Sequence, residues 1–225
     1  MLKPLLTLKH WQIFVALFGG MILFEFLAFS SIFTAAASNQ KPQIEDFQRI
    51  IYIIPIMMLY VMYFTYGWQW AIIELLRNKL PSDVKIPHRR VKIFFFIPII
   101  YMILILFLIL YFVFSIINHP DPEHFFEQSQ LPIFIGITFA IITPLHLFSI
   151  FCIFHSMFFA AKTMKSVELQ REVTFNDFAA EFFLIWFNII GIWILQPRLN
   201  KIITNETEFS TDVVDDLKDD NNEVL

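Results

Sequence analysis

The sequence contains a single cysteine, Cys152, among its 225 residues. One cysteine excludes an intrachain disulfide and any CxxC metal or redox motif. Because Cys152 lies within an apolar run, we interpret it as a buried thiol that packs like a small hydrophobic side chain. The GxxxxGK[ST], GxSxG, HExxH and GxGxxG motifs are also missing. The common nucleotide-binding, hydrolase and zinc-protease classes are therefore left without support.

Charged residues are scarce as well. They make up 16% of the chain, against about a quarter in ordinary soluble domains. Hydrophobic residues reach 57%, and the charges are confined to short segments between long apolar runs. Runs of this length predict an all-α membrane protein, a polytopic bundle of about five transmembrane helices. The predicted spans cover residues 11–37, 50–76, 94–117, 131–161 and 178–195, after a short basic N-terminus at 1–10.

The two ends of the chain are interpreted separately. The first run ends at Ala35–Ser38, a small-residue pattern typical of signal-peptide cleavage sites. It is much longer than a signal h-region of about 7 to 15 residues, and it carries Glu25, so we predict a retained span. Residues 197–225 are acidic and poor in aromatic side chains, with eight acids against Lys218 over 205–225. This composition predicts a disordered tail.

The fourth predicted span, 131–161, is interrupted by Pro144 and His146. As a helix it would reach about 46 Å, well beyond a bilayer core of about 30 Å. A tilt, a kink at Pro144 or an extension past the membrane would accommodate this length. We assign a helix kink to Pro144 and expect the helix to continue past residue 161 into water.

The fifth predicted span follows Thr174, which has the pattern of a helix N-cap with Asp177 three residues later. Pro197 is expected to end it. The run is only about long enough to cross a bilayer, so a re-entrant segment is the alternative. Glu181 near its start could pair with arginines of the second loop.

Small residues predict where helices pack closely. Gly67 and Ala71 lie on one stripe of the second span and form a small-xxx-small pair, which lets another helix approach. Gly191 lies on the more polar seam of the fifth span. We assign these three residues to helix packing.

Four of the five predicted spans place polar side chains near mid-depth, and span three places none there. The residues are Glu25, Tyr60, Tyr63, His146 and Asn188. Unsatisfied polar groups are costly in hydrocarbon, so we expect them to face inward and bond to one another. Interhelical hydrogen bonding accounts for the tyrosines and the asparagine without any function. For Glu25 and His146 we hypothesise a carboxylate–imidazolium pair across the bundle, which would be a functional site.

The distribution of positive charge predicts the orientation, because cytoplasmic loops are rich in Lys and Arg. The loop between spans two and three determines the predicted orientation, because it carries the most positive charges. These are Arg77, Lys79, Lys85, Arg89, Arg90 and Lys92. This places the N-terminus in the cytoplasm, and five spans then place the tail outside; one span fewer reverses that last assignment. The basic residues flank spans and form no domain of their own, so no nucleic-acid partner is predicted.

The loop between spans three and four carries residue types that bind divalent metals, namely His119, Asp121, Glu123 and His124. A solvated, proline-rich turn accounts for the same residues, since short clusters of this kind are unspecific. The sequence therefore predicts no metal and no cofactor, and this loop is kept only as a weak candidate.

Three classes of function compete. A non-enzymatic accessory or scaffold subunit of a membrane complex fits the packing residues and the missing catalytic motifs. Its partners would be the lipid bilayer and other membrane-protein subunits, or a second copy. A small transporter or proton-linked permease using Glu25 and His146 is the alternative, and an intramembrane enzyme would need a nucleophile or metal set that the sequence lacks. The pattern is typical of small bacterial multi-pass proteins, so we predict the first class, in the cell membrane (the inner membrane of a bacterium).

Overall fold

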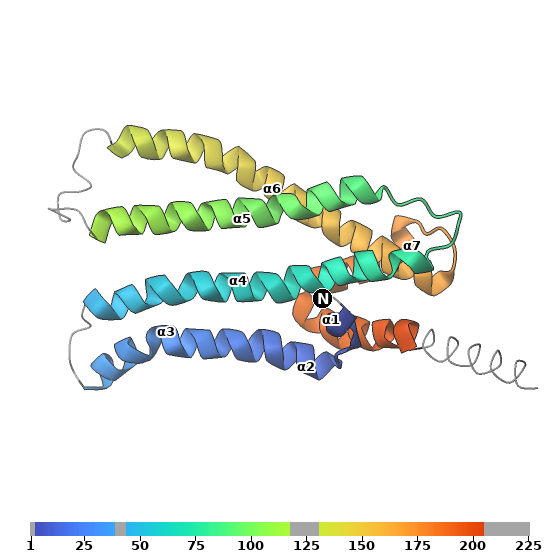
Figure 1. Cartoon of the computed structure of the whole chain (residues 1–225), viewed down its shortest axis with the longest axis horizontal. Helices are drawn as coiled ribbons and strands as arrows, with labels where there is room; N and C mark the ends of the chain where they lie inside the picture. The colour runs from blue at the N-terminus through green and yellow to red at the C-terminus, as the bar shows by residue number, and fades with distance from the viewer. Residues whose placement is uncertain (1–2, 39–43, 118–130, 205–225) are drawn as a thin grey trace, which may run out of the picture. The chain divides into compact units, whose positions relative to one another are not determined.

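The structure is a computed structural model that describes residues 3–38, 44–117 and 131–204. Over these residues the chain is helical and contains no strand, as the sequence predicts (Figure 1). The elements are α1 (Lys3–Thr7), α2 (His10–Phe14), a π-helical turn (Val15–Gly19), α3 (Gly20–Ala37), α4 (Ile44–Leu75), a 3₁₀ turn (Arg77–Lys79), α5 (His88–Ile117), α6 (Leu131–Leu169), α7 (Phe175–Trp186) and a helix at residues 188–204.

Four of the helical stretches are long and apolar enough to cross a membrane. They are His10–Ser30, Ile50–Lys79, His88–Ser115 and Thr138–Leu169. A helix satisfies its own backbone hydrogen bonds, which is why apolar runs of this length are helical in a bilayer. The stretches overlap the first four predicted spans, so those helices are confirmed, whereas the count of about five is not.

The predicted fifth span is not one helix. α7 ends before Phe187, which leaves the helical conformation at φ −84° and ψ 61°, and a second helix covers 188–204. Gly191 explains how sharp this break is, because a Cβ built there would lie 1.9 Å from the carbonyl oxygen of Leu184. Only a glycine lets the second helix begin so close to the backbone of the first.

The C-terminal boundary also differs from the prediction. Pro197 lies within the helix at 188–204 and does not end a span there. The tail predicted over 197–225 therefore starts as a helix, and residues 205–225 lie outside the described residues.

The region between α6 and α7 follows the prediction more closely. α6 continues past its predicted end to Leu169 and remains helical through Pro144. Gln170 then adopts φ 50°, the left-handed conformation common just after a helix. Thr174 caps α7 as expected, since its backbone N–H and its hydroxyl both donate to Asp177, at 2.8 and 2.9 Å.

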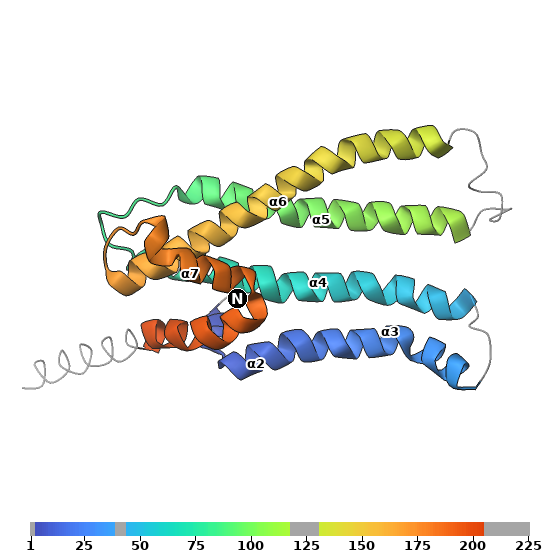
Figure 2. The ribbon, with the colours of Figure 1, turned by 180° about the vertical axis from the view of Figure 1, so that it is seen from behind.

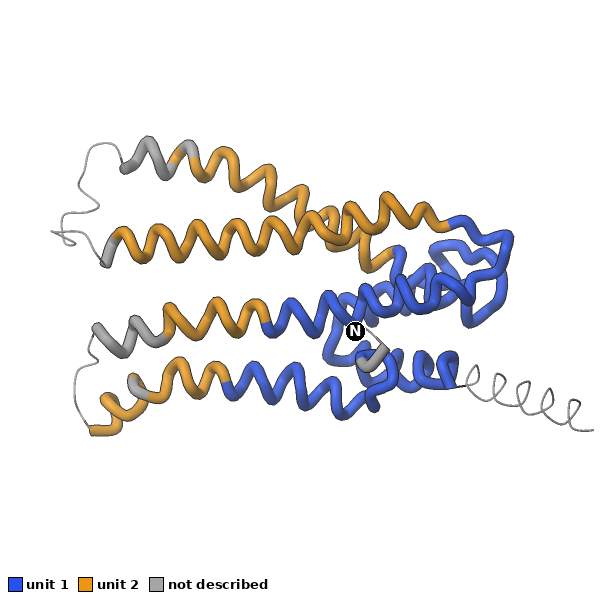
Figure 3. Tube along the Cα trace, in the orientation of Figure 1, with its two compact units in different colours: residues 1–23, 60–85, 159–225 blue, residues 24–59, 86–158 orange. Residues whose placement is uncertain are grey.

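The chain divides into two compact units (Figure 3). Unit 1 comprises Met1–Leu23, Tyr60–Lys85 and Phe159–Leu225, and unit 2 comprises Phe24–Leu59 and Ile86–Phe158. The largest fully buried side chains of the described residues all belong to unit 1: Leu6, Ile13, Trp68, Ile72, Ile73, Leu76, Met164, Phe178, Ile185, Ile192, Leu195 and Leu199. Unit 1 thus holds the largest buried side chains of the described residues.

Within unit 2, α5 and its portion of α6 lie side by side and run antiparallel (Figures 1 and 2). Phe94 stacks on His155 with ring centroids 4.5 Å apart, and Tyr101 meets His146 with ring centroids 5.7 Å apart. Many large apolar side chains on these helices are exposed, among them Phe107, which is 68% exposed. Surfaces of this kind suit contact with lipid or with another membrane helix.

Candidate functional site

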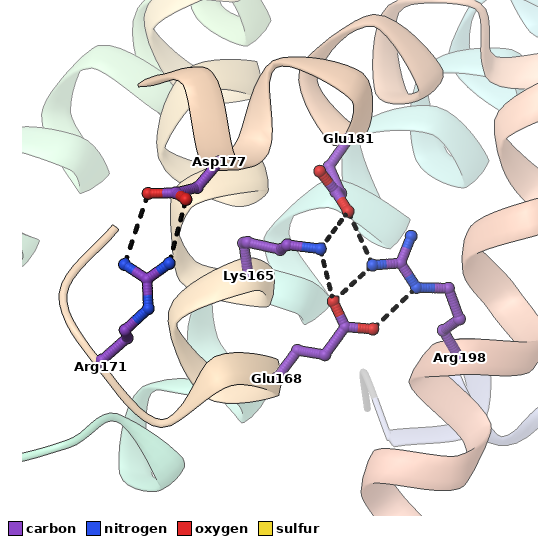
Figure 4. Close-up of polar contacts among 6 residues, drawn as sticks. All are labelled: Lys165, Glu168, Arg171, Asp177, Glu181 and Arg198. Atoms are coloured by element: carbon purple, nitrogen blue, oxygen red, sulfur yellow. Dashed lines mark hydrogen bonds and ion pairs between the residues drawn. The ribbon is translucent and has the colours of Figure 1, made fainter. Parts of the chain in front are cut away.

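Four charged side chains converge in unit 1 (Figure 4). They are Lys165 and Glu168 from α6, Glu181 from α7 and Arg198 from the helix at 188–204, and we call them the charge quartet. Lys165 and Glu168 lie one helical turn apart, and their charged atoms are 3.0 Å apart. Two cations face two anions, so the quartet is neutral as a whole.

Glu181 is the most deeply buried member, with its side chain 4% exposed. Its Oε1 accepts hydrogen bonds from Lys165 Nζ at 3.0 Å and from Arg198 Nη2 at 2.7 Å. Its Oε2 is buried and has no hydrogen-bond partner among the described residues. Burial alone would raise the pKa of this carboxyl, but the hydrogen bonds from Arg198 and Lys165 outweigh burial and hold the pKa below its usual range. Glu181 is therefore ionised at neutral pH.

Arg198 makes a two-point contact with Glu168. Its Nε donates to Oε1 at 2.9 Å and its Nη2 to Oε2 at 2.5 Å, a geometry that fits the guanidinium fork. Burial would lower the pKa of Arg198, but the hydrogen bonds to Glu168 and Glu181 raise it instead. Because Nη2 also binds Glu181, this one arginine joins α6, α7 and the last helix.

The partners of Glu181 differ from those considered in the sequence. The arginines of the second loop were expected there, and the structure places Lys165 and Arg198 instead. The one-turn spacing of Lys165 and Glu168 was visible in the sequence. Arg198 could not be predicted as a partner of Glu181, because a single fifth span would place the two residues on opposite sides of the membrane.

A second polar cluster ties the N-terminal segment of unit 1 to its last helix. Gln196 is fully buried and accepts a hydrogen bond from Trp68 Nε1 at 2.7 Å. Its amide nitrogen lies within hydrogen-bonding distance of the carbonyls of Leu6 (3.0 Å) and Leu8 (2.9 Å). Asn200 also donates to Leu8, at 3.2 Å. The last carbonyls of a short helix such as α1 lack helical partners, so these amides satisfy them.

Lys79 provides a third link within unit 1. Its ammonium group donates to the carbonyl oxygen of Ile202 at 2.8 Å. Carbonyls in the last turns of a helix attract cations, because the helix dipole is negative there. Lys79 belongs to the second loop, so this loop and the last helix meet at the same end of unit 1.

The residues predicted at mid-depth that belong to unit 1 have separate environments. Tyr60 donates its hydroxyl to the carbonyl of Ala16 in the π-helical turn. Its ring rests on Gly20, where a Cβ would come within 2.5 Å, so Gly20 is a packing glycine that was not predicted. Tyr63 is 57% exposed. Asn188 follows the helix break, and its buried Oδ1 has no partner among the described residues.

The other two predicted residues, Glu25 and His146, belong to unit 2, and no hydrogen bond joins them. Glu25 is exposed on α3 and makes no hydrogen bond or ion pair with a described residue. His146 is also exposed, and its Nδ1 lies 3.1 Å from the hydroxyl of Tyr101 on α5. Tyr101 is therefore a partner of His146 that was not predicted, because no mid-depth polar side chain was expected on the third span.

The residues assigned to helix packing all lie in unit 1. Ala71 is fully buried, and a Cβ at Gly67 would come 3.1 Å from the Leu5 side chain. The Gly67 position of the stripe therefore faces α1. Gly191 contacts the backbone at the end of α7, as described above.

The six residues assigned to topology are spread over the second loop and the first turns of α5. Arg77 and Lys79 lie in the 3₁₀ turn, Lys85 is exposed between elements, and Arg89, Arg90 and Lys92 lie at the start of α5. The weak metal candidates His119, Asp121, Glu123 and His124 lie outside the described residues. Within residues 3–38, 44–117 and 131–204, no group of three or more His, Cys, Asp or Glu side chains could hold a metal ion.

The charge quartet has a structural role, because its charges neutralise one another and connect three helices. Exposed polar groups of unit 2, Glu25 and Arg89 among them, have no such partners among the described residues. Comparison of the chain with models of protein families, with curated protein sequences and with solved structures gives no match.

Proposed function

We propose that this is a four-span membrane protein that acts as a non-enzymatic accessory or scaffold subunit of a membrane complex. One observation carries the proposal. Glu25 is the only Asp, Glu, Lys or Arg between Lys9 and Lys41, it lies in the candidate span His10–Ser30, and it is exposed. A charge facing lipid within a span costs about 3 kcal/mol or more. A neighbouring subunit that offers a cation or a hydrogen-bond donor to Glu25 removes this cost.

Within this proposal the N-terminus, the second loop and the last helix lie on the cytoplasmic side of the cell membrane. The contacts of Lys79 with Ile202 and of Gln196 with Leu6 support it, because a fifth crossing would separate these partners. With four spans, every Lys and Arg except Lys41 and Arg49 falls on the cytoplasmic side. The tail then lies inside, on the side opposite to the one that five spans imply.

Cysteine labelling tests this topology. Single cysteines replace Asp83, Glu123 or Asp219 in a Cys152→Ala background, and intact cells are treated with a membrane-impermeant maleimide. We expect labelling only at position 123. Labelling at both position 219 and position 123 would contradict the four-span topology and support a fifth crossing.

The subunit role is tested by purification from native membranes in a mild detergent. We expect a stoichiometric membrane-protein partner that co-purifies with the wild type and is lost in Glu25→Leu. The matched control is Phe26→Leu, because Phe26 is the next residue on the same helix and is 65% exposed. A partner that survives Glu25→Leu shows that Glu25 is not the contact.

The same purification also tests the alternative function, a small transporter or proton-linked permease. This alternative has weaker support, because His146 bonds to Tyr101 and no hydrogen bond joins it to Glu25. A homo-oligomer without other subunits, which binds a ligand in a pH-dependent manner, would favour it over the subunit role.

A further inference from the structure

A basic pocket lies at the start of α5, within unit 2. It has a volume of about 510 Å³ and is lined by Pro87, His88, Arg89, Arg90, Ile93 and Phe94. The basic side chains come first along the chain and the larger apolar ones follow one turn later. Basic and apolar side chains therefore line one pocket, with the basic ones nearer the start of the helix.

The two arginines of this pocket have no acidic partner among the residues that the structure describes. Arg89 and Arg90 are exposed, and neither makes a hydrogen bond or ion pair with a described residue. By contrast, Arg198 in unit 1 binds two carboxylates. No acidic residue occurs in the sequence between Asp83 and Asp121, so the positive charge has no local counterpart along the chain. Guanidinium groups bind phosphate oxygens in a two-point geometry, which makes a phosphate the fitting anion.

The pocket lies at the end of a candidate membrane span. The stretch His88–Ser115 begins at these basic residues, and Ile93 and Phe94 follow inside it. At about 1.5 Å per residue, Ile93 and Phe94 lie about 6 to 8 Å beyond Arg89 along the helix. A phospholipid presents its groups in the same order, with the phosphate at the membrane surface and the hydrocarbon below it.

We propose that this pocket binds the phosphate of an anionic phospholipid. Arg89 and Arg90 bind the phosphate oxygens, and Ile93 and Phe94 contact the first carbons of the acyl chains. A net negative headgroup is favoured over a zwitterionic one, because a choline cation would be repelled by the two guanidinium groups. Each arginine near an anionic lipid surface contributes about fivefold in affinity.

The test uses the full chain in an uncharged detergent and dioctanoyl phosphatidylglycerol as the probe. Binding is followed by microscale thermophoresis. We expect Arg89→Gln and Arg90→Gln each to weaken binding about fivefold, and the double variant about 25-fold. Dioctanoyl phosphatidylcholine, with the same chains and a neutral headgroup, should bind at least about tenfold more weakly than phosphatidylglycerol.

Lys92→Gln is the matched control. Lys92 is exposed on the same helix and carries the same charge, but it does not line the pocket. We expect it to change affinity less than about twofold. A loss equal to that of Arg89→Gln would mean that charge alone attracts the lipid, and the pocket would be discarded.

Inorganic phosphate is the second probe, because it shares the anion and lacks the chains. We expect Ile93→Ser to weaken binding of phosphatidylglycerol and to leave binding of inorganic phosphate unchanged. Equal affinity for the two probes would assign the pocket to free phosphate and overturn the lipid proposal. Arg89→Lys keeps the charge without the fork and should fall between the wild type and Arg89→Gln, with an unchanged unfolding temperature, which separates a binding effect from misfolding.

Discussion

The two units of this protein differ in how several of their polar side chains are placed. In unit 1, Glu181 is buried between Lys165 and Arg198, and Gln196 bonds through both its oxygen and its nitrogen. In unit 2, Glu25 and Arg89 are exposed and have no hydrogen bond or ion pair with a described residue. Polar groups that are hydrogen-bonded within a unit stabilise that unit, whereas exposed polar groups are available to bind a lipid or another subunit. For this reason we expect stability to respond to changes in unit 1 and binding to changes in unit 2.

The largest expected effect is on the charge quartet. Arg198→Met removes one cation and leaves Glu168 and Glu181 with Lys165 alone. Stranding a buried carboxylate costs about 3 to 5 kcal/mol of unfolding free energy. We expect a large fall in the unfolding temperature, followed by tryptophan fluorescence in detergent.

Removing both partners sharpens this test. In Glu181→Leu combined with Arg198→Met, the neutral pair of Lys165 and Glu168 remains, so the double variant should be more stable than Arg198→Met alone. Arg171→Gln serves as the surface control, because the Arg171 side chain is 54% exposed. Simple addition of the two single effects would show that Glu181 and Arg198 do not interact.

The second prediction compares one glycine from each unit. At Gly191 a Cβ would lie 1.9 Å from the Leu184 carbonyl oxygen, whereas at Gly136 it would meet nothing within 4 Å. Gly191→Ala should therefore cost about 3 kcal/mol, because the backbone of two helices has to move apart. Gly136→Ala should be neutral or gain up to about 1 kcal/mol from helix propensity. Equal unfolding temperatures for the two variants would mean that the chain does not turn closely at Gly191.

The third prediction concerns the hydrogen bond between Tyr101 and His146 in unit 2. Interhelical hydrogen bonds in membranes average about 0.6 kcal/mol, so Tyr101→Phe should lower stability by about that amount. His146→Leu and Glu25→Gln should have additive effects on the unfolding temperature, because no hydrogen bond joins these residues. A single variant that is less stable than the double would instead support the carboxylate–imidazolium pair hypothesised from depth.

The apolar runs were sufficient to predict four helices, because a run of about 20 residues determines both the helix and its length. Run length also predicted that α6 continues past residue 161, and the spacing of Thr174 and Asp177 predicted the cap of α7. These features depend on neighbouring residues only. They can therefore be found without knowing what the helices contact.

The break at Phe187 could not be found in this way. Residues 178–195 are apolar throughout most of their length, so local composition favours one span. The observed turn depends on Gly191 beside Leu184 and on Arg198 bound to Glu168, and these contacts exist only once the chain has folded. The hydrogen-bond partners of the mid-depth residues could not be predicted for a related reason. Depth in a span does not determine which way a helix is rotated, and rotation decides that Tyr60 bonds to Ala16 and His146 to Tyr101.

The smallest expected effect comes from the cap of α7, where unit 1 carries a paired carboxylate at its surface. Asp177 accepts hydrogen bonds from Arg171 and from the backbone and hydroxyl of Thr174, which lower its pKa from 3.8 to about 2. A carboxyl whose pKa is lower in the folded state stabilises that state only while it is ionised. Its contribution is therefore complete above the ordinary pKa of 3.8 and is lost as the pH falls towards 2.

Asp177→Asn removes this contribution at every pH. The unfolding temperature of the variant should lie a little below that of the wild type at neutral pH, and the gap should close as the pH falls from about 4 to about 2. Arg171→Gln removes the largest cause of the lowered pKa, so its own gap from the wild type should close over a similar range. Asp83→Asn is the control, because Asp83 is exposed and makes no hydrogen bond or ion pair with a described residue. A gap for Asp177→Asn that stays constant down to pH 2 would mean that the Asp177 carboxylate is not bound by Arg171 and Thr174, and that the start of α7 is held by its packing alone.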